Sequence, residues 1–216
     1  MSSAGELVTE RFAFDGGRLV TAYVPRRPPE AVVFAGDGEL IAPWGAEIAC
    51  AGGPATLIVG IHRAADDMHR LHEYSPGFAP ERFAPHERFL RDDVRTWMRA
   101  RFGADLPRER TATCGVSAGG EFALAFALRH PDIIGAMLCA SPGAGFRPPD
   151  IWPDRIPRAY FVAGTREPFF HANAQRWAEA LRGAGAEVRM CERDGSHGDD
   201  FWRTEFPAMV GWAFAH

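Results

Sequence analysis

Short apolar runs alternate with longer amphipathic segments along most of this chain, and the alternation limits the folds open to it. The runs Ala31–Ala35, Thr56–Ile61 and Thr111–Val116 are nearly continuous in apolar residues, as in strands that helices cover on both faces. A segment long enough to form a helix follows each run. The pattern predicts an α/β fold: an about eight-stranded, mainly parallel sheet with helices on both faces, in a three-layer sandwich.

The remaining elements are expected on the same grounds. Further strands are expected at Arg11–Phe14, Arg18–Val24, Ile133–Cys139, Ala159–Ala163 and Glu187–Cys191, the first two joined as a hairpin by Asp15-Gly16-Gly17. Helical patterns cover Ile41–Ala51, His86–Phe102, Glu121–Arg129, Asn173–Arg182 and Phe201–Phe214. The stretch Ala64–Pro85 is polar and proline-punctuated, and we expect a long ordered loop there.

Composition narrows the classes of function. The 216 residues are 46% hydrophobic, enough for one core, so we expect a single domain over residues 1–216. A net charge of −4 without a basic stripe argues against a nucleic-acid partner. No apolar stretch is long enough to span a membrane and the amino terminus does not resemble a signal peptide, so we expect no membrane partner and a cytoplasmic location. The sequence is compatible with a homodimer.

Two residue types bear on the chemistry. All 24 positive side chains are arginines, which excludes lysine-based Schiff-base chemistry. The cysteines are widely spaced and three lie in apolar runs, so we expect four free core thiols: Cys50, Cys114, Cys139 and Cys191. No metal-ligand motif is present, and we expect neither a metal nor a cofactor.

The segment Gly115–Gly119, sequence GVSAG, lies directly after an expected strand and before an expected helix. In this context the G-x-S-x-G pattern forms a sharp turn that exposes the serine hydroxyl, and glycines are needed where the turn approaches its neighbours. The following helix directs its free N–H groups toward the same place, which suits a developing oxyanion. We therefore predict Ser117 as a nucleophile.

A serine hydroxyl needs a general base, and eight histidines are candidates. His197 lies in the loop Gly195–Gly198 after the last expected strand, where it can reach Ser117. The third member should be a carboxylate between these two in the chain. Glu167 follows the strand Ala159–Ala163 and is our choice. The flanking carboxylates of the histidine are alternatives: Asp194, Asp199 and Asp200.

The turn after the strand Ala31–Ala35 reads Gly36-Asp37-Gly38-Glu39 and can expose successive N–H groups. We expect the backbone N–H of Glu39 or Gly38 to join that of Ala118 as an oxyanion hole.

With these motifs in this order, the chain resembles, from about Ala31 to the C-terminus, the esterase family that includes enterochelin esterase and esterase D. The segment Arg70–Pro76 resembles that family's R-x-x-E-Y stretch, and Gly164–Pro168 resembles the G-x-x-E-P of enterochelin-esterase-like members, which supports Glu167. The resemblance implies the α/β-hydrolase fold and ester hydrolysis. The chain departs from siderophore-hydrolysing members, because no appreciable domain precedes the hairpin and no basic cluster is evident.

We therefore predict a serine esterase that acts on a small-molecule ester through an acyl-enzyme. Transfer of the acyl group to an alcohol, or a non-catalytic ligand-binding protein, are the alternatives. Arginine and aromatic side chains near the carboxyl ends of strands are the expected substrate-binding residues: Trp44, Arg63, Arg70, Tyr74 and Trp152.

Overall fold

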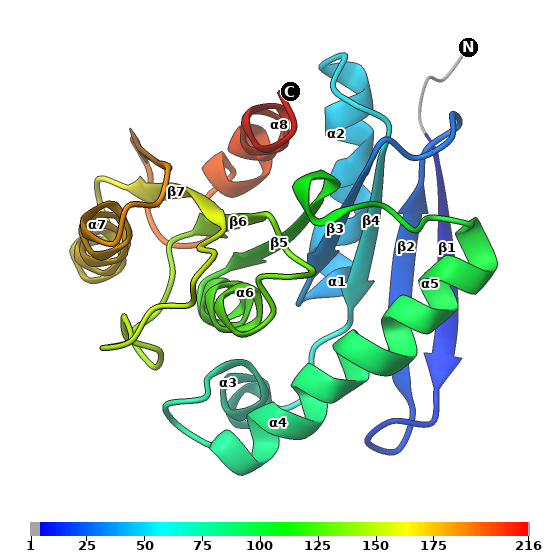
Figure 1. The fold of residues 1–216 in the computed structure, drawn as a ribbon, viewed down its shortest axis with the longest axis horizontal. Coiled ribbons are helices and arrows are strands. Elements are labelled where there is room, and N and C mark those ends of the chain that lie inside the picture. Colours follow the sequence, from blue (N-terminus) through cyan, green and yellow to red (C-terminus); the bar gives the residue numbers. More distant parts are fainter. Residues whose placement is uncertain (1–4, 216) are drawn as a thin grey trace.

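The computed structural model describes residues 5–215 and is built on one eight-stranded sheet (Figure 1). The strands are β1 (Glu6–Phe12), β2 (Arg18–Val24), β3 (Ala31–Ala35), β4 (Thr56–Ile61), β5 (Thr111–Val116), β6 (Ala136–Ala140), β7 (Arg158–Gly164) and β8 (Val188–Arg193). Their order in the sheet is β1-β2-β4-β3-β5-β6-β7-β8. The β1–β2 and β2–β4 pairs are antiparallel, and all others are parallel. The predicted mainly parallel sheet is confirmed.

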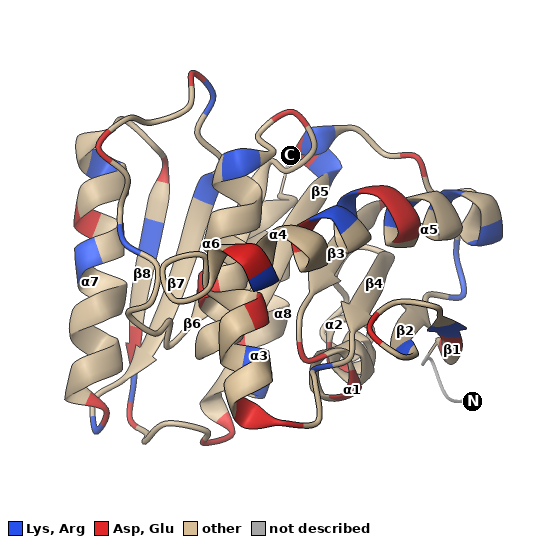
Figure 2. Ribbon diagram, turned by 90° about the horizontal axis from the view of Figure 1, so that it is seen from below, with Lys and Arg blue, Asp and Glu red and all other residues tan. Residues whose placement is uncertain are grey.

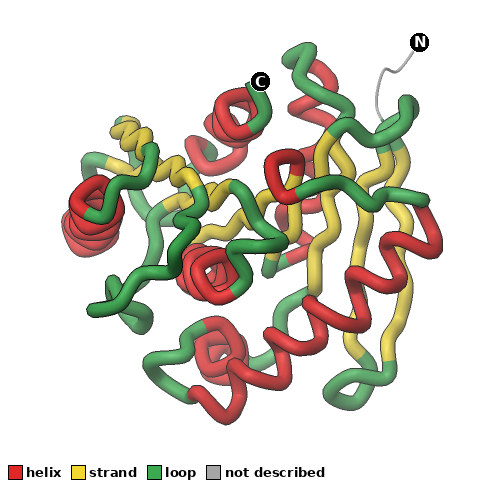
Figure 3. The backbone as a smooth tube through the Cα atoms, viewed as in Figure 1, coloured by secondary structure: helices red, strands yellow, loops and turns green. Residues whose placement is uncertain are grey.

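Helices follow the strands on both sides of the sheet (Figure 3). The α-helices are α1 (Gly38–Ile41), α2 (Gly45–Cys50), α3 (Asp67–Tyr74), α4 (Pro80–Arg88), α5 (Arg95–Phe102), α6 (Ala118–Arg129), α7 (Pro168–Gly183) and α8 (Phe201–Ala213). Short 3-10 turns cover Ala42–Trp44 and Arg108–Arg110, and a π-helical turn, Phe89–Val94, joins α4 to α5.

Two apolar cores hold the layers together, one on each face of the sheet. The core that contains Phe122 and Trp177 lies between the sheet and the helices α3 to α7, and the core that contains Ile48 and Phe206 lies between the sheet and α1, α2 and α8. Strands β3, β4 and β5 are buried along their whole length. Because both of their faces are covered, their sequences are nearly continuous in apolar residues. Figure 2 accordingly shows charged residues of both signs mainly on loops and helix surfaces.

Three expectations for the first half of the chain were wrong. Strand β1 covers Glu6–Phe12 rather than Arg11–Phe14; it is an exposed edge strand, and its polar side chains hide the apolar pattern expected of a strand. Residues 64–85 contain α3 and α4 instead of a long loop: the Asp66 carboxylate accepts the N–H of His69 at 2.8 Å as a helix cap, and Pro80 occupies the first turn of α4. The expected helix Ile41–Ala51 is divided into α1, a 3-10 turn and α2.

Smaller differences occur in the second half. Strand β6 begins at Ala136, because Ile133 and Ile134 form a turn and donate their N–H groups to the His130 carbonyl. Helices α6 and α7 begin three and five residues before the expected starts, at Ala118 and Pro168. All four cysteines are free, but only Cys114 and Cys139 are buried: Cys191 is partly exposed, and Cys50 is exposed at the end of α2.

The strand order reverses at β3, and a crevice is expected at the carboxyl ends of the strands beside this reversal. Strand β3 lies between β4 and β5, so the chain leaves β3 on one side for β4 and returns on the other side for β5. Loops at the carboxyl ends of β3 and β5 therefore diverge and leave space between them. These loops carry Gly36–Glu39 and Ser117.

A buried histidine in α4 gives a first prediction. His86 is completely buried against the rings of Tyr74 and Phe122, and within residues 5–215 neither of its ring nitrogens has a hydrogen-bond partner. Burial lowers the pKa of His86 to about 3. The unfolded chain, with an ordinary histidine pKa of about 6.5, therefore binds one more proton than the folded protein between these values. This histidine makes stability fall as the pH falls through that window, by up to about 1.4 kcal/mol per pH unit.

The substitution His86→Leu should make the free energy of unfolding depend less on pH between about pH 6 and pH 4. Urea unfolding at half-unit pH steps measures the slope, and His69→Gln, at an exposed histidine of α3, is the matched control. An unchanged slope in His86→Leu would show that the acid sensitivity comes from other groups.

Candidate active site

Ser117 lies at the turn between β5 and α6, in a backbone conformation that side chains rarely adopt (φ 56°, ψ −125°). Its N–H donates to the Ala140 carbonyl of β6 at 3.0 Å. A β-carbon on Gly115 would lie 1.9 Å from the Gly119 carbonyl oxygen, so only glycine allows the helix to approach the strand here. The close approach keeps the turn sharp and presents the Ser117 hydroxyl at the carboxyl edge of the sheet.

His197 reaches this hydroxyl from the loop between β8 and α8. Its Nε2 lies 3.0 Å from Ser117 Oγ. The Phe170 ring stacks on the imidazole at a centroid distance of 3.6 Å, and the Trp202 ring meets it at 87° and 4.8 Å. Two aromatic rings therefore hold the imidazole plane in an orientation that directs Nε2 at the serine.

Glu167 completes a continuous hydrogen-bonded series. Its side chain is 2% exposed, and its Oε2 lies 2.7 Å from His197 Nδ1. Its Oε1 accepts the N–H of Gly164 and the hydroxyl of Ser141, both at 2.5 Å. The structure thus brings together Ser117, Glu167 and His197, although Ser117 and His197 are 80 residues apart in the sequence.

The alternative carboxylates are engaged elsewhere. Asp194 accepts two hydrogen bonds from Arg166 at 2.9 and 3.1 Å. Asp199 accepts the N–H of Ser196 at 2.6 Å and lies 3.6 Å from Arg166. Asp200 lies at the start of α8, 4.0 Å from Arg203. The first two carboxylates tie the ends of the histidine loop to Arg166, next to Glu167, and so steady the loop that carries His197.

The expected oxyanion donors lie at two helix starts beside Ser117. The Asp37 carbonyl accepts the N–H groups of Leu40 and Ile41, so α1 begins at Gly38. The N–H groups of Gly38 and Glu39, in the first turn of α1, and of Ala118, first in α6, have no acceptor within their helices. A β-carbon on Gly38 would lie 2.1 Å from the Gly60 carbonyl oxygen, so the turn packs directly on β4.

A buried network holds the Asp37 turn in place. Arg70 donates to both oxygens of the Asp37 carboxylate at 2.6 and 2.7 Å. The N–H of Asp37, whose φ is 50°, donates to the Tyr74 hydroxyl at 2.7 Å. Burial raises the pKa of Tyr74 well above its ordinary value, so the phenol stays neutral. Arg70 and Tyr74 therefore fix the left-handed turn from which α1 begins.

A cleft of about 260 Å³ opens above Ser117 and His197. Of the expected substrate-binding residues, Arg63 and Arg70 line it, and Glu39 of the expected oxyanion hole does so too. Leu40 and Trp202 complete its walls. Sequence reasoning did not single out Trp202, because it lies within an expected helix and not in a loop at the end of a strand.

The three expected aromatic residues do not line this cleft. Trp44 is buried and packs on Phe206 of α8, at a ring distance of 5.5 Å. Tyr74 is fully buried and serves the Asp37 network. Trp152 lines a separate pocket beside Gly135, near the amino end of β6. We expected the rings of Trp44 and Tyr74 at the rim of the site, but both are buried in the core.

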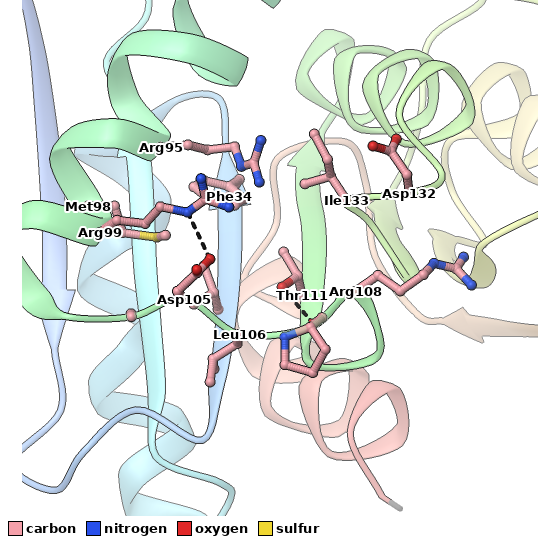
Figure 4. A pocket seen from close by; sticks show the side chains of 13 residues that line it. Phe34, Arg95, Met98, Arg99, Asp105, Leu106, Arg108, Thr111, Asp132 and Ile133 are labelled. Carbon is pink, nitrogen blue, oxygen red and sulfur yellow. Dashed lines mark hydrogen bonds and ion pairs between the residues drawn. The ribbon is translucent and has the colours of Figure 1, made fainter.

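A further pocket, of about 140 Å³, lies near the amino ends of β3 and β5, beside the paired residues Val32 and Thr111 (Figure 4). Arg95 and Arg99 of α5 face it, and Arg99 forms an ion pair with Asp105 at 2.8 Å. It shares no lining residue with the cleft at Ser117.

Within residues 5–215, no group of three or more His, Cys, Asp or Glu side chains is placed to hold a metal ion. In the same part of the chain, no helix has both the length and the apolar character that crossing a bilayer requires.

Comparison with known families and structures gives the wider context. The model of the Esterase family, described as "Putative esterase", matches residues 53–213. The chain belongs to this family. The Esterase family match covers β4 to α8 and includes Ser117, Glu167 and His197. It confirms the predicted resemblance and the prediction of a carboxylic ester hydrolase. No curated protein sequence matches the chain.

Solved structures share the fold at low sequence identity. Ferric enterobactin esterase from Salmonella typhimurium is similar with a TM-score of 0.83 and 20% identity; the match covers 98% of this chain and 58% of that one. A ferulic acid esterase from Anaeromyces mucronatus gives 0.73 and 18%, covering 97% and 90%. S-formylglutathione hydrolase from Staphylococcus aureus gives 0.72 and 12%, covering 97% and 98%. These likenesses confirm the α/β-hydrolase fold.

Proposed function

We propose that the protein is a serine esterase that cleaves a small-molecule carboxylic ester through an acyl-enzyme on Ser117. The observation that carries the proposal is the hydrogen-bonded series from Ser117 Oγ through the His197 imidazole to Glu167, at 3.0 and 2.7 Å. A buried carboxylate that accepts from Nδ1 leaves Nε2 as the acceptor for the serine proton, which is the arrangement that a serine nucleophile needs.

The geometry supports a two-step reaction. Ser117 Oγ attacks the ester carbonyl carbon while its proton passes to His197 Nε2, and the carbonyl electron pair moves to the oxygen. The N–H groups of Ala118 and of Glu39 or Gly38 stabilise that oxyanion. When the intermediate collapses, the alcohol leaves with the proton from Nε2. Water then attacks the acyl-enzyme, its proton passes to Nε2 and on to the departing Ser117 oxygen, and the carboxylic acid is released.

The walls of the cleft favour an uncharged ester. Arg70 is paired with Asp37, Arg63 is paired with Asp67, and Glu39 adds a further carboxylate. The arginines are therefore already neutralised by neighbouring acids, and Leu40 and Trp202 supply apolar surface. We propose a small neutral ester with an apolar acyl or alcohol group as the substrate class.

Labelling with a fluorophosphonate probe tests the nucleophile directly. The folded protein should take up one probe per chain, and the heat-denatured protein none, because the reaction needs the assembled base and oxyanion hole. Trypsin cleavage after Arg110 and Arg129 yields a peptide in which Ser117 is the one serine, so mass spectrometry locates the label. A folded protein that is unlabelled, or labelled on another peptide, would overturn the proposal and favour a ligand-binding role.

A further inference from the structure

The far side of the Glu167 carboxylate is connected to a tryptophan in the wall of the cleft. Ser141, which follows β6, is completely buried and has a positive φ of 48°. Its Oγ lies 2.5 Å from Glu167 Oε1 and 2.8 Å from Trp202 Nε1. Trp202 lies in the first turn of α8, five residues after His197. One short segment therefore supplies both the imidazole and a support for the carboxylate that the imidazole contacts.

The direction of the hydrogen bonds follows from what each group can donate. An indole nitrogen is a donor only, so Ser141 Oγ accepts from Trp202. An ionised carboxylate is an acceptor only, so the Ser141 hydroxyl proton points at Glu167 Oε1. Oε1 also accepts the N–H of Gly164. Both neighbours of Oε1 are thus donors, and Oε2 remains to accept the Nδ1 proton of His197.

We infer that Trp202 is a positioning residue for the esterase reaction: through Ser141, its indole N–H holds the Glu167 carboxylate aimed at His197. Trp202 acts on His197 through two residues, Ser141 and Glu167, in addition to lining the cleft. The inference rests on the proposed function, because it assigns a role within the same Ser117 reaction.

Substitutions that remove only the hydrogen bonds separate this role from the cleft wall. Trp202→Phe keeps an aromatic ring but removes the indole N–H. Ser141→Gly removes the hydroxyl and suits the positive φ of this position. The matched control is Trp212→Phe, in the same helix, whose ring packs on Tyr160 and Arg158 instead.

The inference predicts that Trp202→Phe lowers kcat about tenfold for a short p-nitrophenyl ester and changes KM less than twofold, the loss expected when a hydrogen bond to a charged group is weakened. Ser141→Gly should lower kcat by at least as much. In the Ser141→Gly background, Trp202→Phe should have less than a twofold further effect, because the connection is already broken. Trp212→Phe should match the wild type.

A proton NMR spectrum provides a readout that does not depend on turnover. The Nδ1–H of His197, bonded to a buried carboxylate, should give a downfield resonance that Glu167→Gln abolishes. Trp202→Phe should shift or broaden it, and Trp212→Phe should not. This measurement stands even if Ser141→Gly does not fold.

Two results would overturn the role of Trp202. One is an equal loss of kcat from Trp202→Phe in the wild-type and Ser141→Gly backgrounds, which would indicate a cleft-wall effect alone. The other is a Trp202→Phe variant with unchanged kcat and an unchanged downfield resonance. Failure of the proposed function would look different, because turnover would then persist in Ser117→Ala.

Discussion

Ser117→Ala should lower kcat/KM for a short p-nitrophenyl ester by about 10⁴- to 10⁶-fold, to the level left by binding and the oxyanion hole. Alanine removes the nucleophile but keeps the β-carbon, and the hydrogen bond that the hydroxyl loses is the one to His197 Nε2 at 3.0 Å. Steady-state kinetics with enzyme freshly purified from an expression host free of the wild-type protein measures the loss.

His197→Ala should cost a similar factor, and the double variant should cost no more than either single one, because the two groups act as a unit. Circular dichroism and thermal unfolding confirm that each variant is folded. Residual turnover within tenfold of the wild type in Ser117→Ala would exclude Ser117 as the nucleophile.

Glu167→Gln should lower kcat by about 10⁴-fold, although the amide has almost the same shape as the carboxylate. The amide oxygen is held by the N–H of Gly164 and the hydroxyl of Ser141, so the amide NH₂ faces His197. The imidazole must then accept at Nδ1 and carry its proton on Nε2, which can no longer accept from Ser117.

Asp194→Asn is the matched control for Glu167→Gln. It removes a carboxylate near the same histidine, but one that is exposed and paired with Arg166. Its effect on kcat should stay below about tenfold, because exposed ion pairs contribute up to about 1 kcal/mol. A larger loss from Asp194→Asn than from Glu167→Gln would assign the third position to Asp194.

The centre of the sheet was predictable because its strands are covered on both faces. Burial on both sides makes β3, β4 and β5 mostly apolar, with threonine as their only polar residue type, so their sequences indicate buried strands. The edge strand β1 is exposed on most positions, and its first five residues include only two apolar ones, Leu7 and Val8. The helices α3 and α4 were missed because the prolines and acids that begin helices also occur in loops.

The positions of the three candidate catalytic residues, each after a parallel strand, predicted that their side chains lie close together. Parallel strands place all of their carboxyl ends at one edge, so residues directly after β5, β7 and β8 converge there. The aromatic lining was not predictable in the same way. Trp44 and Trp202 both lie beside strand ends, and only the packing of α8 decides that the first ring is buried on Phe206 and the second faces the cleft.

Strand β8 is the last strand of the sheet and pairs on one side only, with β7, and most of its residues are partly or fully exposed. Ser117, in contrast, follows a strand that lies between β3 and β6. Protection against local opening is smallest at such edges. Ser117 therefore follows a strand that is paired on both sides, whereas His197 follows a strand at one edge of the sheet. We expect local opening of β8 to move His197 away from Ser117 while the central strands stay paired.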